Sequence, residues 1–357
     1  MKTAFKGKKI EGLLAVLPEQ EILFEDEMSN YAFPEKQTIK LKKLMGYKQH
    51  RVVKEKTASS DLCLAGFDRI ISQGWIKKED VGAIIVVSST HDHLLPGTSS
   101  IIHGHYGFSE DVLCFDMMQG CTGFMQGLYQ SFMLLEHMEG KKVVLFNVEV
   151  LSKKTSKRDR NSYPLIGDAA SIAVISNTTE DKNIFYNGKY DGTRYESLII
   201  PAGGSRMECT AETAEMKDFD GDGNYRCLNN LKMDGTGVFE FVQKDVPPMI
   251  LETLDFAGLK TEDIDWYLFH QPNKFMLKKL AEKLEVPYEK VPMNIVENFG
   301  NSSGVCVPLN IAFNFGEKMT QESYKCCLSA FGSGLSWSAF VMELGNMSFC
   351  EMLVSEY

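Results

Sequence analysis

The sequence predicts an α/β protein made of two similar units. Apolar runs of strand length alternate with longer segments whose apolar residues repeat at helical spacing, and this alternation occurs twice, on either side of residues 177–184. The chain has 357 residues, more than the roughly 250–300 at which a single hydrophobic core stops growing. We therefore expect one unit over residues 1–180 and a second over 181–357, related by the order of their elements.

The first unit contains the clearest strand signals. The run IEGLLAVLP near the N-terminus predicts a first strand, and four further apolar runs predict strands at 81–90, 112–117, 141–150 and 167–176. Helical spacing predicts a short helix over 98–107 and a longer one from Cys121 to about Met138. Strands that alternate with helices in this way are typical of α/β layering.

The second unit repeats this order. Its expected elements are an irregular insertion at 201–230, a helix over 238–258 interrupted at Pro247-Pro248, a strand over 264–273 that runs into a loop, helices over 274–286 and 302–316, and two strands over 324–344 joined by a glycine turn.

Composition and charge argue against several classes of protein. Hydrophobic residues make up 44% of the chain, and no apolar run approaches the ~20 residues needed to cross a bilayer. The apolar run near the N-terminus is short, is broken by Glu11 and lacks a cleavage site, so it does not predict a signal peptide. A net charge of −10 disfavours nucleic acid as a partner. The nine scattered cysteines without a C-x-x-C pair predict reduced thiols and a cytoplasmic protein.

One cysteine stands at a position suited to a nucleophile. Cys121 lies between Gly120 and Gly123, just before a helical run. A helix N-terminus carries unpaired N–H groups and partial positive charge, which would favour the thiolate and lower its pKa. The Cys121 N–H could also donate to an oxyanion. An inert buried thiol would fit the same local sequence.

Two polar residues in the second unit stand at the ends of elements. His270 lies where a predicted strand becomes a loop, and Asn301 lies in a glycine turn before a helical run. Functional side chains are often carried at such places, although a structural histidine and a plain turn asparagine would look alike.

Four motifs together give the chain a specific resemblance. DMMQGCTGFMQGL, HQPN, GNSSG followed by VP, and FGSGLSW occur in the order and spacing of β-ketoacyl-acyl carrier protein synthase III, a condensing enzyme of the thiolase superfamily. The resemblance extends over nearly the whole chain, including GYKQHRVV, GDAAS and MDGTGVFEFV.

The resemblance implies a fold, a reaction and a set of residues. The fold would be a five-layer αβαβα sandwich of two pseudo-symmetric halves, working as a homodimer. Cys121 matches the acyl-accepting nucleophile, while His270 and Asn301 match the pair that stabilises the enolate left when a malonyl thioester loses carbon dioxide. The N–H groups of Cys121 and Ser333 would form the oxyanion hole, and Phe331 would line the site. No metal or other cofactor is implied.

The sequence also departs from this family. The tryptophan and arginine of its coenzyme A clamp fall at Lys40 and Leu44, which favours donors and malonyl groups carried on acyl carrier protein. The basic residue linked to carrier-protein docking is Phe275, so we assign docking to Lys274 and Lys278. Leu95, together with Leu94 and Phe108, is expected to shape an acyl tunnel built from both subunits. These departures predict a specialised member that serves a secondary lipid or polyketide.

Two further patterns resemble metal sites. His91, His93, His103 and His105 form two H-x-H pairs, and DFDGDGNY (218–225) starts like a calcium loop. The twelfth position of that loop is Asn229 instead of the bidentate glutamate, so a polar turn is the better interpretation.

Other functions share parts of this pattern. The same fold could transfer the Cys121-bound acyl group to an alcohol, amine or thiol without decarboxylation, but His270 and Asn301 favour condensation. A non-catalytic partner subunit would usually lack the nucleophile. A papain-like hydrolase lacks support around the cysteine, and a thiolase would need a second catalytic cysteine in the FGSG region.

Overall fold

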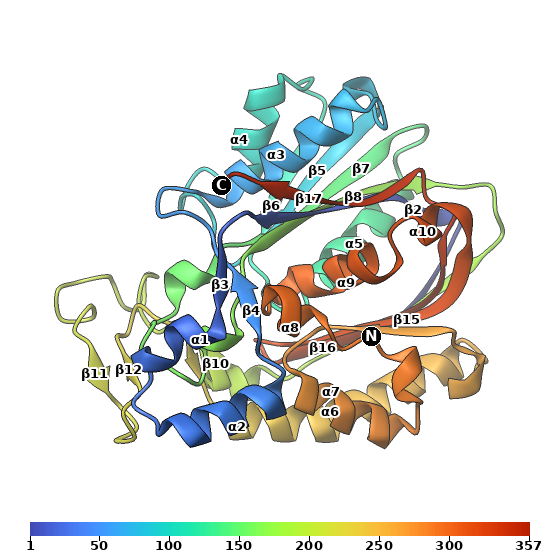
Figure 1. Cartoon of the computed structure of the whole chain (residues 1–357). Helices are drawn as coiled ribbons and strands as arrows, with labels where there is room; N and C mark the ends of the chain where they lie inside the picture. The colour runs from blue at the N-terminus through green and yellow to red at the C-terminus, as the bar shows by residue number, and fades with distance from the viewer.

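Two β-sheets lie face to face, with helices between them and on both outer faces, in a computed structural model that describes residues 1–357 (Figure 1). The layers follow the order helix, sheet, helix, sheet, helix. This arrangement confirms the predicted five-layer α/β sandwich.

The sheet of the first half has six strands in the order β17-β2-β8-β7-β5-β6. Most residues of the central strands are buried on both faces, which is why they form continuous apolar runs in the sequence. The strands are β2 (Lys8–Pro18), β5 (Val81–Val87), β6 (Leu113–Met117), β7 (Lys142–Glu149), β8 (Ala169–Asn177) and β17 (Phe349–Ser355).

The sheet of the second half has five strands in the order β1-β9-β16-β15-β14. Both sheets share one pattern, in which a parallel strand pair is followed by two antiparallel pairs. In the second sheet β14/β15 is parallel, and β15/β16 and β16/β9 are antiparallel. In the first sheet β5/β7 is parallel, and β7/β8 and β8/β2 are antiparallel. The strands are β1 (Lys2–Lys6), β9 (Asn183–Tyr190), β14 (Trp266–Phe269), β15 (Ser323–Gly332) and β16 (Ser336–Gly345).

The two ends of the chain cross between the halves. β1 pairs with β9 in the sheet of the second half, and the C-terminal β17 pairs with β2 in the sheet of the first. A division at residue 180 falls in the turn between β8 and β9, but it places both terminal strands in the wrong half. Edge pairing between distant segments leaves no local sequence signal.

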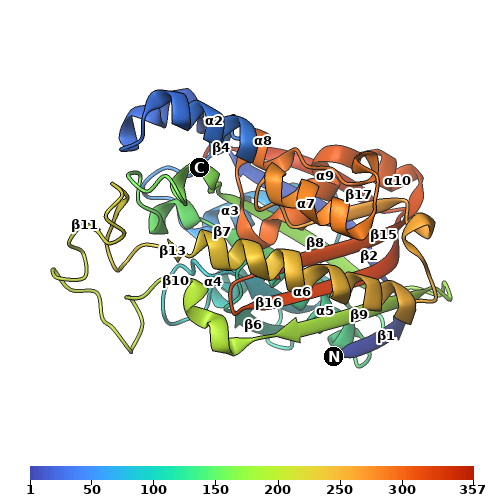
Figure 2. The ribbon, with the colours of Figure 1, turned by 90° about the horizontal axis from the view of Figure 1, so that it is seen from below.

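Two helices lie between the sheets and four cover the outer faces. α5 (Gly123–Leu135) and α9 (Cys306–Phe315) contact both sheets and belong to the largest core, a cluster of 38 buried residues. None of the helices has the length and apolar character that a membrane span requires. The outer helices are α3 (Ser59–Ser72) and α4 (Thr98–Tyr106) on the first sheet, and α6 (Gly235–Phe256) and α7 (Lys274–Leu284) on the second (Figure 2).

The predicted interruption of α6 is wrong. The helix continues for 22 residues through Pro247-Pro248. Two prolines remove two N–H donors from the helix. Val246, Met249 and Ile250 are nevertheless fully buried in the outer core of the second half, and this packing outweighs the lost hydrogen bonds.

Most of the remaining elements lie at one end of the sandwich (Figure 1). Residues 21–51, between β2 and α3 and here called the N-terminal extension, pack with Leu165 and Val296 in a small separate core. Residues 201–230 contain only short strands between turns, as predicted. The extension contains β3 (Glu21–Leu23), α1 (Phe24–Glu27), α2 (Glu35–Met45) and β4 (Gln49–Arg51); the insertion and its flanks contain β10 (Leu198–Ile199), β11 (Lys217–Asp218), β12 (Tyr225–Arg226) and β13 (Lys232–Met233); α8 (Ile295–Phe299) and α10 (Lys318–Gln321) flank α9.

Candidate active site

Side chains from three distant segments line one cavity of about 740 Å³. Cys121 lies just before α5, His270 follows the last residue of β14, and Asn301 lies in the turn between α8 and α9. Phe331 near the end of β15 lines the same cavity. The structure therefore brings together four of the residues that the sequence singled out.

Glycines allow the close approach of the segments around Cys121. A Cβ atom at Gly332 would lie 2.4 Å from the Cys121 Cβ and 2.5 Å from its Sγ. A Cβ atom at Gly120 would lie 2.7 Å from the Ser333 Oγ. Any side chain at these positions would displace the sulfur or the turn that faces it.

The Cys121 thiol is held close to several hydrogen-bond donors. Burial raises its pKa, while hydrogen bonds from the Ser333 N–H and the Ser303 hydroxyl, 3.9 Å from Sγ, act in the opposite direction. The negative charge of Glu149 adds to the rise. The expectation of a lowered pKa is therefore wrong, because removal of the thiol from water outweighs the donors around it.

Two backbone N–H groups point toward the sulfur. Those of Ser333 and Cys121 both favour the charged form of the thiol, and neither donates to another backbone carbonyl oxygen. Both are therefore available to an oxyanion formed next to Cys121.

His270 is buried and uncharged at neutral pH. The residue is 2% exposed, and burial lowers the pKa of its imidazole to about 4, although a hydrogen bond with the Ser303 backbone acts in the other direction. Its ring packs edge-on against Phe331 with the centroids 5.5 Å apart. A neutral imidazole can donate one hydrogen bond without adding positive charge to the cavity.

The amide of Asn301 has a defined orientation. Its Oδ1 atom accepts hydrogen bonds from the Ser303 N–H at 2.9 Å and from the Cys306 thiol at 3.1 Å. Because the carbonyl end is occupied, the NH₂ end remains for the cavity. Cys306 and Ser303 were not predicted as site residues; their proximity to the asparagine in GNSSGVC is the only signal that could have indicated them.

Other predicted residues lie away from the cavity of this chain. Leu94 and Leu95 are 94% and 87% exposed, and Phe108 is buried in the outer core of the first half. None of the three lines the cavity. For Leu95, a role in lining the tunnel of a second subunit stays a prediction.

The two lysines assigned to docking lie beside a separate groove. Lys274 and Lys278 line a hollow of about 470 Å³ together with Trp266. Phe275, between them, lines the active-site cavity and stacks on Phe239 with the ring centroids 5.5 Å apart. The first turns of α7 therefore lie between the lysine groove and the cavity, with side chains in both.

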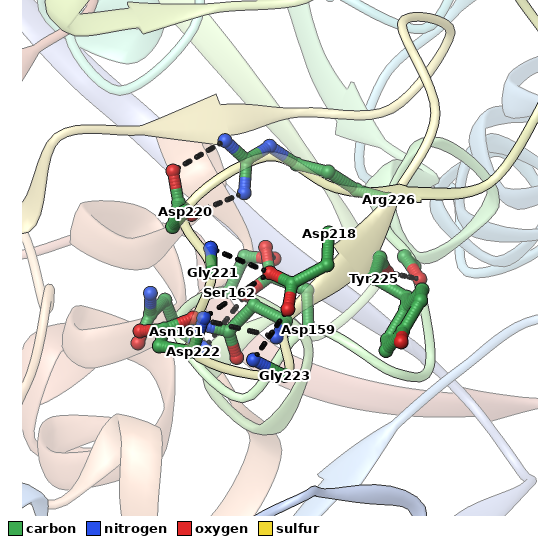
Figure 3. A network of polar contacts seen from close by, with 12 residues as sticks. Asp159, Asn161, Ser162, Asp218, Asp220, Gly221, Asp222, Gly223, Tyr225 and Arg226 are labelled. Carbon is green, nitrogen blue, oxygen red and sulfur yellow. Dashed lines mark hydrogen bonds and ion pairs between the residues drawn. The ribbon is translucent and has the colours of Figure 1, made fainter.

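The insertion at 201–230 contributes to the cavity wall. Asp220 and Asp222 line the cavity. Asp220 pairs with Arg226 at 2.7 Å (Figure 3), and Asp222 pairs with Arg160 at 2.9 Å. Asp218 accepts hydrogen bonds from backbone N–H groups of the loop, including those of Gly221 and Gly223. The carboxylates of the calcium-like motif thus contact arginines and backbone donors.

The four clustered histidines do not converge. His103 Nε2 lies 3.1 Å from the Ser109 carbonyl oxygen, His105 packs against Tyr106, and His91 lies 3.8 Å from Asp116. No group of three or more His, Cys, Asp or Glu side chains lies close enough together to hold a metal ion.

Comparison with known proteins gives the family. The model described as 3-oxoacyl-[acyl-carrier-protein (ACP)] synthase III matches residues 115–191, and the model of its C-terminal part matches residues 254–344. A relative from Campylobacter jejuni, assigned by name to 3-oxoacyl-[acyl-carrier-protein] synthase 3, is 30% identical over 355 residues, or 99% of each chain. A β-ketoacyl-[acyl-carrier-protein] synthase III from Caldanaerobacter subterraneus is 31% identical over 84% of this chain and 87% of its own.

A solved structure agrees in fold over its full length. The crystal structure of 3-oxoacyl-(acyl-carrier protein) synthase from Burkholderia xenovorans LB400 covers 99% of both chains with a TM-score of 0.91 and 26% sequence identity. Sequence, fold and the grouping of Cys121, His270 and Asn301 lead to the same conclusion. The chain belongs to the 3-oxoacyl-[acyl-carrier-protein] synthase III family of condensing acyltransferases.

Proposed function

We propose that the chain forms a β-ketoacyl thioester by condensing a Cys121-bound acyl group with malonyl-acyl carrier protein, in fatty acid or polyketide-like synthesis. The observation that carries the proposal is the presence of a thiol, a neutral imidazole and an oriented carboxamide in one cavity. Transfer of an acyl group alone would need the thiol and its oxyanion donors but not the other two groups.

In the first step, the Cys121 sulfur attacks the carbonyl carbon of an acyl thioester. A C–S bond forms, and the carbonyl π electrons move to oxygen, where the N–H groups of Cys121 and Ser333 stabilise the charge. The intermediate collapses with loss of the donor thiol, which takes up the proton from Cys121. Because burial raises the pKa of Cys121, attack and loss of this proton are expected to occur together.

In the second step, malonyl thioester occupies the cavity and loses carbon dioxide. The electron pair of the broken C–C bond forms an enolate whose oxygen accepts hydrogen bonds from His270 and the Asn301 amide. The enolate carbon then attacks the acyl carbonyl, a C–C bond forms, and the Cys121 thiolate leaves and takes up a proton from solvent. Atoms and electrons balance without an added oxidant or reductant.

Intact-mass analysis tests this proposal with the full chain and a panel of acyl donors carried on acyl carrier protein or on coenzyme A. We expect an acyl adduct that is absent from Cys121→Ala, followed by release of carbon dioxide and a β-ketoacyl product when malonyl carrier protein is added. Acyl loss to an alcohol, amine or thiol without carbon dioxide would contradict the proposal and favour simple transfer.

We propose that the carrier protein docks on α7 through Lys274 and Lys278. Both lysines line the groove beside the cavity, and Lys274 lies 3.4 Å from Glu297, which leaves Lys278 as the better contact for an acidic partner. Lys278→Glu should raise KM for substrates on carrier protein but not for the same acyl group on pantetheine. Lys283→Glu, on the same helix but outside the groove, provides the matched control.

We also propose a cytoplasmic homodimer. The nine cysteines are free thiols, which suits a reducing compartment. β6 pairs with β5 on one side only and forms an edge of the sheet, and Leu94, Leu95 and Met118 expose 94%, 87% and 73% of their surface. An edge and apolar surface of this kind favour a second copy as the partner. Light scattering should give twice the chain mass, and Leu95→Asp should lower the dimer fraction.

A further inference from the structure

A buried histidine links the N-terminal extension to the backbone that holds Asn301. His50 lies on β4 and is 2% exposed. Its Nδ1 atom lies 2.5 Å from the Ile166 carbonyl oxygen, and its Nε2 atom lies 3.0 Å from the Glu27 carboxylate. Glu27 is itself only 5% exposed. The reaction described above uses neither side chain.

The segment that His50 contacts is also the segment that aligns Asn301. The Leu165 carbonyl oxygen accepts the Asn301 N–H at 2.6 Å, and the Gly167 N–H donates to the Asn301 carbonyl oxygen at 3.1 Å. Ile166, between them, forms a parallel bridge with Asn301. The backbone of Asn301 is therefore held on both sides by a segment whose middle carbonyl is bound by His50.

The backbone around Gly300 and Gly167 has little space to shift when His50 moves. A Cβ atom at Gly300 would lie 2.9 Å from the His50 Cβ and 2.8 Å from the Gly167 nitrogen. A Cβ atom at Gly167 would lie 2.0 Å from the Phe299 carbonyl oxygen. Because these backbones are in direct contact, a displacement at His50 is transmitted to the turn that carries Asn301.

Glu27 determines how the ring is held. Burial alone would lower the pKa of His50, but the Glu27 carboxylate and the Ile166 carbonyl together raise it above its usual value. The two ring nitrogens have different partners: Nδ1 has the Ile166 carbonyl as a hydrogen-bond acceptor, and Nε2 faces the Glu27 carboxylate as an ion pair. Tyr163 packs against the His50 ring, with the two rings perpendicular and their centroids 5.4 Å apart.

We propose that His50, oriented by Glu27, is a positioning residue that holds the Asn301 amide where the enolate oxygen forms. It would therefore support mainly the malonyl step. Cys121 and the Ser333 N–H are carried by other segments, the one just before α5 and the β15–β16 turn, and the turn of Asn301 reaches the thiol through the Ser303 hydroxyl, 3.9 Å from Sγ. This inference rests on the proposed function, since it assigns Asn301 to the malonyl step.

Two substitutions at His50 separate its two contacts. His50→Asn places an amide nitrogen near the position of Nδ1, which keeps the donor to Ile166 and loses the contact with Glu27. His50→Gln places the amide nitrogen near the position of Nε2, which keeps the contact with Glu27 and loses the donor to Ile166. We expect His50→Gln to lower the malonyl decarboxylation rate by about 10²-fold, the cost of a misplacement of about 1 Å. His50→Asn should retain most of that rate. In both variants the acylation of Cys121 should fall far less than decarboxylation, because only the Ser303 hydroxyl links the displaced turn to the thiol.

Hydrogen–deuterium exchange provides a measurement that does not depend on activity. Amides in the segment 299–304 and at Gly167 should exchange faster in His50→Gln than in the wild type, and little faster in His50→Asn. This pattern would still be measured if the wild type condensed no substrate, so failure of the proposed function can be told apart from failure of this inference. Equal exchange and equal rates in the two variants would overturn the role of His50.

Glu27→Gln is a milder variant in case either change at His50 prevents folding. It keeps an acceptor oxygen next to Nε2 but removes the negative charge that raises the pKa of His50. We expect a smaller loss of decarboxylation than in His50→Gln, with unchanged acylation of Cys121 by intact mass. A parallel loss of acylation and decarboxylation would mean that the pair only stabilises the fold, and the proposal would then be wrong.

Discussion

The two ends of the active-site cavity are built in different ways. At the inner end, Cys121, His270 and Asn301 are held by close backbone contacts and by hydrogen bonds between buried groups. At the mouth, the insertion is held by ion pairs such as Arg160 with Asp222, in which the aspartate side chain is 44% exposed. Close packing defines positions within fractions of an ångström, whereas exposed charges are screened by salt and adjust easily. Chemistry should therefore depend on the inner end, and the mouth should tolerate change.

The largest effect is expected at the Asn301 amide. Asn301→Asp keeps the oxygen that accepts the Ser303 N–H but removes the donor to the enolate. We expect condensation to fall by about 10²–10³-fold, or about 2.7–4 kcal/mol of transition-state stabilisation. Cys121 acylation should fall much less, through the added negative charge in the cavity of the thiol. Single-turnover assays of the two steps measure this split. Asn298→Asp, on α8 and outside the cavity, should change neither step.

The packing of the inner end can be broken at Gly332. Gly332→Ala adds a methyl group only 2.5 Å from the Cys121 sulfur, so the thiol must move relative to its N–H donors. We expect acylation to slow by about 10²-fold, as for a displacement of about 1 Å. Gly192→Ala adds a methyl group with no atom within 4 Å and serves as the control. Normal acylation in Gly332→Ala would show that the inner end is less rigid than we infer.

Burial of His270 predicts how stability depends on pH. Its pKa is lowered from 6.5 to about 4 in the folded state, so the folded protein binds this proton less readily than the unfolded chain does. The stabilisation is complete above about pH 6.5 and is lost as the pH falls toward 4, by about 3 kcal/mol in total. When the free energy of unfolding is measured with denaturant at several pH values, it should fall more steeply with decreasing pH for the wild type than for His270→Gln. Equal slopes would mean that the imidazole is hydrated.

The smallest effect is expected at the mouth. Asp222→Asn removes the charge that pairs with Arg160 but keeps the size of the side chain. Since the pair is partly exposed, we expect a loss of about 0–1 kcal/mol of stability, smaller still at high salt, and unchanged acylation by a short acyl donor. Asp181→Asn, which breaks the exposed pair with Lys6, is the control. A large loss of acylation in Asp222→Asn would contradict the distinction between the two ends.

The sequence predicted some features of this molecule and missed others for identifiable reasons. The strands at β5, β7 and β8 were predicted because burial on both faces makes each a continuous apolar run. The continuous α6 was missed because proline propensity is local, whereas its stability comes from packing against the second sheet. The exchange of β1 and β17 between the sheets was missed because edge pairing joins segments far apart in the chain.

For the active site, the sequence alone determined which side chains are present and at which element ends they stand. Motifs and periodicity are local, so Cys121, His270, Asn301 and Phe331 could be named without coordinates. Only the tertiary structure decided the raised pKa of the thiol, the direction of the Asn301 amide and the contact between His50 and Ile166. Each of these depends on burial and on atoms brought together from distant segments, and no short stretch of sequence contains that information.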